Sequence, residues 1–203
     1  MMNEIGNAGE GQLLSRFMWV VAYSLFLVTS ALAQTVQVTS SPRPFSAVAP
    51  TSWTQQETTT GNSRIKFAAP AGTPSAECAV IVKEFPSLRG EPQSTFDQKM
   101  AEPLDPTEMA SQLSSRYNNV KVFATGVASV SGYPAKLFNV QYSVGTPSGE
   151  LWARGVLVTT ATTPGLVWTI SCGALGLSPA EAQKGYSYWQ SEIMRFPTNI
   201  KIQ

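Results

Sequence analysis

The sequence predicts an α+β domain in which helices pack on an antiparallel sheet of about six or seven strands. Between residues 63 and 172, several segments alternate apolar and polar side chains with a period of two, which is typical of strands. The connections between successive predicted strands are short, which favours antiparallel neighbours. Two other segments combine a helix start signal with apolar residues three and four apart, as in a helix that packs on one face.

The first part of the chain predicts a signal peptide over residues 1–33. An uncharged apolar run extends from Phe17 to Ala33, directly after Arg16, and ends in the small-residue pattern Ala31-Leu32-Ala33. An uncleaved anchor helix is the alternative, but this run is short for a membrane span. We therefore expect a mature chain that starts at Gln34, has no stable membrane anchor, and resides in the periplasm or outside the cell.

Residues 34–49 predict an extended, poorly ordered linker. They are rich in Ser, Thr, Pro and Val, and their apolar residues follow neither the period of a strand nor that of a helix. A single α+β domain over residues 50–203 is expected to follow. About 150 residues are enough to bury one hydrophobic core.

The predicted strands are read from the alternation in chain order. Trp53–Thr60 and Ser63–Phe67 form a hairpin across Gly61-Asn62. Cys78–Phe85 is almost continuously apolar, which predicts a strand that is covered on both faces. The remaining strands are expected at 119–130, 135–144, 151–160 and 166–172.

The helices have clearer start signals. Ser178-Pro179-Ala180-Glu181 is a capping box, and the apolar residues Tyr186, Trp189, Ile193 and Phe196 follow it at helical spacing. Asp105-Pro106-Thr107-Glu108 repeats the signal, with Met109, Leu113 and Tyr117 four residues apart. A shorter helical turn is expected at 94–100.

Several short motifs resemble those of PsbP-like domains. Pro50-Thr51-Ser52-Trp53, followed by residues 64–70, resembles the first hairpin of that family. Residues 131–135 resemble its tight turn into a central strand, and the helix that carries Trp189 and ends near Phe196 resembles its terminal helix. The resemblance covers about residues 48–200. It implies an α-β-α sandwich and a non-catalytic accessory or partner-binding role. Members bind metal ions, a photosystem or a small GTPase, but the metal and photosystem roles have no match in these residues.

Composition excludes several classes of function. Lys plus Arg is 14 against Asp plus Glu 13, so the net charge of +1 argues against a nucleic-acid partner. There is no histidine, which excludes Ser-His-Asp and Cys-His catalysis and histidine-containing zinc sites. We expect no cofactor and no metal.

Cys78 and Cys172 are the only cysteines. They lie too far apart in the sequence for a metal-ligand motif, and an oxidising compartment favours a disulfide between them.

No group of residues forms a convincing catalytic motif. Glu102, Asp105 and Glu108 are close in sequence, but acids at a helix start are better explained by capping. A serine paired with Lys136 or Lys184 stays an alternative without a motif. Trp53, Trp152, Trp168 and Trp189 are expected in the core, and Trp152 with Arg154 is the first pair to test for a ligand groove.

The sequence thus predicts an exported accessory or binding protein rather than an enzyme, with no catalytic residues. Its partner is expected to be a protein or a small ligand in the cell envelope. The alternative is an envelope hydrolase that uses a serine or carboxylate mechanism without histidine.

Overall fold

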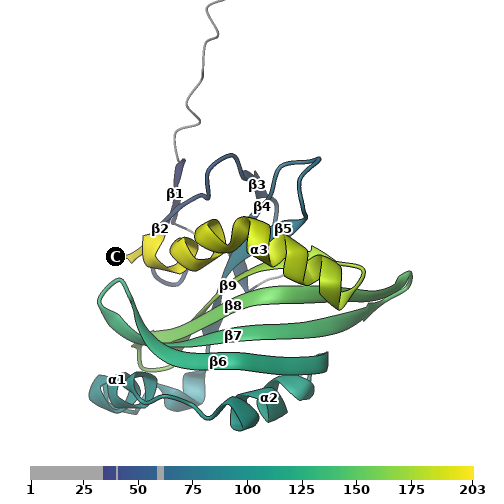
Figure 1. Ribbon diagram of the computed structural model, residues 1–203. Coiled ribbons are helices and arrows are strands. Elements are labelled where there is room, and N and C mark those ends of the chain that lie inside the picture. Colours follow the sequence, from purple (N-terminus) through teal and green to yellow (C-terminus); the bar gives the residue numbers. More distant parts are fainter. Residues whose placement is uncertain (1–33, 40, 59–61) are drawn as a thin grey trace, which may run out of the picture. The chain divides into compact units, whose positions relative to one another are not determined.

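The computed structural model describes residues 34–39, 41–58 and 62–203, so the predicted signal peptide lies outside the described residues. A seven-stranded antiparallel sheet with strand order β3-β4-β5-β9-β8-β7-β6 forms the centre of the fold (Figure 1). Its strands are β3 (Thr54–Gln56), β4 (Ser63–Ala68), β5 (Ala76–Glu84), β6 (Asn118–Val130), β7 (Tyr133–Thr146), β8 (Gly149–Thr163) and β9 (Leu166–Gly176).

Helices cover both faces of this sheet. The long helix α3 (Pro179–Arg195) lies on one face, called here the α3 face. The shorter helices α1 (Gln93–Ala101) and α2 (Pro106–Ser114) lie on the opposite face, called the α2 face. Two short 3-10 helices, η1 (Pro86–Leu88) and η2 (Phe196–Asn199), follow β5 and α3. The predicted α+β class, with helices packed on an antiparallel sheet, is confirmed.

The segment predicted to be a poorly ordered linker instead contains two strands. In a second, three-stranded sheet, β2 (Phe45–Val48) pairs antiparallel with β1 (Thr35–Val38) and with β10 (Ile200–Ile202). Phe45 is fully buried, and its ring meets that of Trp168 edge-on with centroids 5.3 Å apart. The pairing joins the two ends of the described chain, so no local pattern in the sequence could show it.

The main hydrophobic core lies on the α3 face. Trp168, Ile170 and Cys172 of β9 project into it and are at most 1% exposed. Tyr186 and Ile193 of α3 close the core from above. Among the described residues, no helix is both long enough and apolar enough to span a membrane.

Strand β5 corrects the expectation of two covered faces. Cys78, Val80 and Val82 point to the α3 face and are almost fully buried, but Ala79 and Ile81 point to the α2 face and stay half-buried. An apolar run therefore does not prove that both faces are covered, because an open face can also carry aliphatic side chains. The half-open α2 face is where the candidate site lies.

Candidate functional site

Helices α1 and α2 cover only one half of the α2 face. Met109 of α2 packs on Phe138 and Val140 of β7, with Leu113 and Leu157 at the margin of this small cluster. Beyond it, most α2-face side chains of β5 and β9 are half-buried, Lys83 is exposed, and no helix lies above them. On the α2 face, the sheet is therefore covered by helices over β6 and β7 and open over β5 and β9.

A shallow trough of about 90 Å³ lies on the open part of the sheet. Its floor includes Gly155 and Gly173, which are direct partners in the β8–β9 ladder. A Cβ at Gly155 would collide with the backbone carbonyl of Cys172, so glycine is required there by close backbone approach. Ala79 and Ala153 add only methyl groups. The hollow follows from this lack of side-chain volume.

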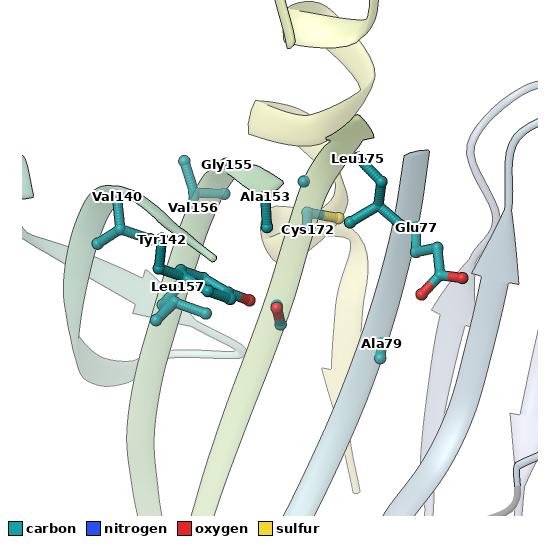
Figure 2. A pocket seen from close by; sticks show the side chains of 12 residues that line it. Glu77, Ala79, Val140, Tyr142, Ala153, Gly155, Val156, Leu157, Cys172 and Leu175 are labelled. Atoms are coloured by element: carbon teal, nitrogen blue, oxygen red, sulfur yellow. The ribbon is translucent and has the colours of Figure 1, made fainter. Parts of the chain in front are cut away.

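Tyr142 forms one wall of the trough. Figure 2 shows its ring extending from β7 toward β9, with Glu77 on β5 at the far margin and its carboxylate turned away. The Tyr142 ring stacks at a tilt on Tyr117, with centroids 4.3 Å apart. Burial, with smaller contributions from Tyr117 and Glu77, raises the pKa of Tyr142 to about 12. The phenol is therefore a neutral hydrogen-bond donor at physiological pH and is poorly suited to act as a base.

A larger cleft of about 380 Å³ continues from the trough beneath α2, and the two share Tyr142, Leu157 and Ser171. Apolar side chains, hydroxyl groups and two cations line it. The lining residues are Ile81, Lys83, Phe85, Met109, Gln112, Leu113, Ser115, Arg116, Tyr117, Tyr142, Leu157, Thr159, Val167, Thr169 and Ser171. None of these is acidic.

The two acidic residues of β5 are engaged in ion pairs. Glu77 forms an ion pair with Lys66 at 2.8 Å, and Glu84 forms one with Arg89 at 2.7 Å. Within the described part of the chain, no group of three or more acidic residues or cysteines is arranged to hold a metal ion. The site is thus a ligand cleft of apolar, hydroxyl and cationic groups.

The two cysteines lie behind this site, in the core on the α3 face. The structure joins Cys78 of β5 to Cys172 of β9 in a disulfide, with their Cα atoms 4.1 Å apart. They are direct partners in the β5–β9 ladder and are at most 1% exposed. The bridge therefore fixes the register of the two strands that carry the open part of the α2 face.

The sequence suggested Trp152 and Arg154 as the first pair to test for a ligand groove. Arg154 lies on the α3 face. It is only 5% exposed, and its guanidinium lies over the rings of Phe123 and Tyr186, at 4.0 and 4.4 Å from their centroids. Its Nε donates to Gln183 Oε1 at 3.1 Å, and its Nη1 donates to Asn139 Oδ1. Burial lowers its pKa, against a smaller opposing effect of Tyr186. Arg154 thus ties α3 to the sheet and lines neither the trough nor the cleft.

Asp105, one of the acidic residues considered for catalysis, caps a helix instead. Asp105 Oδ1 accepts hydrogen bonds from the backbone N–H groups of Thr107 and Glu108, at 2.8 and 3.3 Å. These bonds lower the pKa of Asp105 below its ordinary value of 3.8. In the described residues, no hydrogen bond joins Lys136 or Lys184 to a serine.

The cleft residues were not singled out from the sequence, although one signal was present. Strand β9 places Thr169 and Ser171 on the face opposite Trp168 and Ile170. Small polar residues on one face of a strand indicate an open face. The position of α2 at the margin of this open face could not be read from the pattern.

Comparison with solved structures identifies the fold. The solution structure of cyanobacterial PsbP (CyanoP) from Synechocystis sp. PCC 6803 superposes with a TM-score of 0.52 at 10% identity, covering 84% of this chain and 94% of that one. LpqN of Mycobacterium tuberculosis, described as involved in cell envelope biogenesis, gives a TM-score of 0.47 at 12% identity, covering 84% and 91%. No protein-family model and no curated protein sequence matches the chain. The chain therefore has a PsbP-like α+β sandwich fold.

Proposed function

We propose that this protein is exported and acts in the cell envelope or outside the cell as a non-catalytic binding protein, with the cleft beneath α2 as its binding site. The cleft itself carries the proposal, because it combines an apolar lining with hydroxyl groups that can orient a ligand. Export is supported by the apolar run up to Ala33 and by the disulfide, which is typical of oxidising compartments.

The chemistry of the cleft favours binding over hydrolysis. A serine nucleophile needs a base within hydrogen-bond reach. Ser115 Oγ instead donates to the carbonyl of Gln112 at 2.8 Å, and in the described residues Ser171 has no side-chain hydrogen bond to a lysine or a carboxylate. The raised pKa of Tyr142 also keeps that group protonated. Ser171 and Tyr142 can donate hydrogen bonds to a ligand, but they do not form a proton-transfer pair.

Export is tested by N-terminal sequencing of the protein from its native host. We expect the chain to begin at Gln34, after the Ala31-Leu32-Ala33 pattern. An intact Met1 or Met2 on a membrane-bound product would contradict export with cleavage.

Binding is tested by native mass spectrometry of the protein purified from the envelope fraction of its host. We expect a bound molecule in the wild type and in Thr198→Trp, an exposed position near the C-terminus, but not in Thr169→Trp, which fills the cleft. The same preparations should not turn over esterase, glycosidase, peptidase or phosphatase substrates. A turnover that disappears in Ser171→Ala or Glu77→Gln would overturn the non-catalytic assignment, and equal occupancy in Thr169→Trp would exclude the cleft as the binding site.

A further inference from the structure

We propose that the cleft beneath α2 binds a small amphipathic anion, in which an apolar body carries a carboxylate or phosphate head group. This inference rests on the proposed binding function and adds the chemical class of the ligand. The cleft volume of about 380 Å³ is in the range of small-molecule sites, which begins at about 300 Å³. The occupant is thus a small molecule rather than a protein segment.

The apolar body is accounted for by the two sides of the cleft. Met109 and Leu113 project from α2, and Ile81, Leu157 and Val167 project from the sheet. These side chains can cover a hydrocarbon or aromatic group from both sides, which removes its surface from water.

Half-buried hydroxyl groups lie along the same surface. Thr159 of β8 and Thr169 and Ser171 of β9 line the cleft, and in the described residues none of their hydroxyls forms a side-chain hydrogen bond. Tyr142 adds a phenol that stays protonated, because burial raises its pKa to about 12. All four groups can donate to the oxygen atoms of an anionic head group.

The charged residues of the cleft indicate the sign of the ligand's charge. Lys83 and Arg116 are the charged residues of the cleft, and neither forms an ion pair with a described carboxylate. Lys83 Nζ lies 4.9 Å from the centroid of the Phe85 ring instead. The neighbouring acids of β5 are neutralised by Lys66 and Arg89. Both charged side chains of the cleft lining are therefore positive, in a chain of nearly balanced charge, which favours an anion over a neutral or cationic ligand.

The test is calorimetric titration of the protein purified from its native host with four probes that share one alkyl chain: octanoate, octyl phosphate, octanol and octylamine. We expect at least one anion to bind about tenfold or more tightly than octanol, with octylamine weakest, because a charge-assisted contact adds roughly 1.4 kcal/mol or more. The stronger of octanoate and octyl phosphate identifies the head group. Anion binding should also weaken as salt is added.

Matched variants assign the contacts. Lys83→Gln and Arg116→Gln should each weaken anion binding by about fivefold or more and leave octanol binding unchanged, because only the charge contact is lost. Lys99→Gln, an exposed position on α1 outside the cleft, makes the same change in net charge and should have no effect. Thr169→Trp should abolish binding of every probe.

The outcomes separate this inference from the proposed function. If octanol and octylamine bind as tightly as the anions, and Thr169→Trp abolishes binding of all four probes, the binding site stands and the anionic ligand is wrong. The same conclusion follows if neither Lys83→Gln nor Arg116→Gln weakens anion binding. If no probe binds the wild type, the inference is overturned. If in addition no molecule co-purifies with the wild type, the proposed function fails as well.

Discussion

The two faces of the seven-stranded sheet differ in what their side chains do, although the same strands supply both. On the α3 face, β9 contributes Trp168 and Ile170, which are fully buried beneath α3 and the small sheet. On the α2 face, the same strand contributes Thr169 and Ser171, which line an open cleft. Because successive side chains point to opposite faces of a strand, one segment can hold a core and present a binding surface.

The difference extends to the arginines on the two faces. Arg154 on the α3 face is buried between two aromatic rings and is bonded to neutral acceptors of the protein. Arg116 borders the cleft on the α2 face and has no ion-pair partner in the described residues. A cation whose contacts are satisfied within the fold stabilises it, whereas a cation that borders an open cleft can interact with a ligand.

The largest expected effect comes from comparing adjacent residues of β9. Trp168→Ala should lower the free energy of unfolding by about 3–5 kcal/mol, because it empties a fully buried site and removes the hydrogen bond to Thr162. Thr169→Ala should change it by less than about 0.5 kcal/mol. Urea unfolding of both variants measures the difference. Similar losses at both positions would mean that the α2 face is as tightly packed as the α3 face.

The disulfide should have the next largest effect. The double variant Cys78→Ala/Cys172→Ala should lose about 2–4 kcal/mol of unfolding free energy, because the bridge constrains the unfolded chain over a sequence separation of 94 residues. Chemical denaturation of the oxidised wild type, the reduced wild type and the double variant measures this. Thiol titration of the unfolded, unreduced protein is the control. Two reactive thiols in the wild type would rule out the bridge.

The fold was accessible from the sequence because its signals are local. Alternation along residues 135–144 and 151–160, and the capping boxes at Asp105 and Ser178, each report the structure of a few neighbouring residues. The predicted strands mostly correspond to observed ones, and the observed strands β7, β8 and β9 extend beyond the predicted ranges.

The small sheet and the cleft depend on contacts between distant parts of the chain. Strand β2 is stabilised by β10, whose residues come from the other end of the described chain, and by the contact of Phe45 with Trp168. The cleft exists because α2 stops short of β5 and β9, which follows from tertiary packing rather than from periodicity. The disulfide could be predicted because the chain has only two cysteines, Cys78 and Cys172. That they lie directly opposite each other on β5 and β9 could be known only from the register of the two strands.

A third prediction uses pH to examine Tyr142, which belongs to the α2 face. Its pKa is raised to about 12, so the folded state keeps a proton that the unfolded state loses near pH 10. The contribution to stability is therefore complete below about pH 10 and is lost as pH rises toward 12. The wild type should lose about 1–3 kcal/mol more than Tyr142→Phe over this range, since one pKa unit corresponds to roughly 1.4 kcal/mol. Denaturant unfolding of both proteins measures this difference, and parallel pH profiles would show that the phenol is well solvated.

The smallest expected effect concerns the two helix caps, one on each face. Asp105 caps α2, a nine-residue helix with Met109 as its one buried residue, whereas Ser178 caps the longer α3 through the N–H of Glu181. Short helices depend on their caps and on few packing contacts. Asp105→Ala should therefore speed amide hydrogen exchange in α2, leave α3 unchanged, and shift the global unfolding midpoint only slightly.

The matched variant Ser178→Ala should instead speed exchange in the first turn of α3 and leave α2 unchanged. Because its hydrogen bonds lower the pKa of Asp105 below 3.8, the capping contribution is present above that pH and is lost as pH falls through the lowered value. Wild-type α2 should thus lose protection in acid, relative to Asp105→Ala, while α3 keeps it. If Asp105→Ala loosened both helices equally, the two faces of the sheet would open as one unit rather than independently.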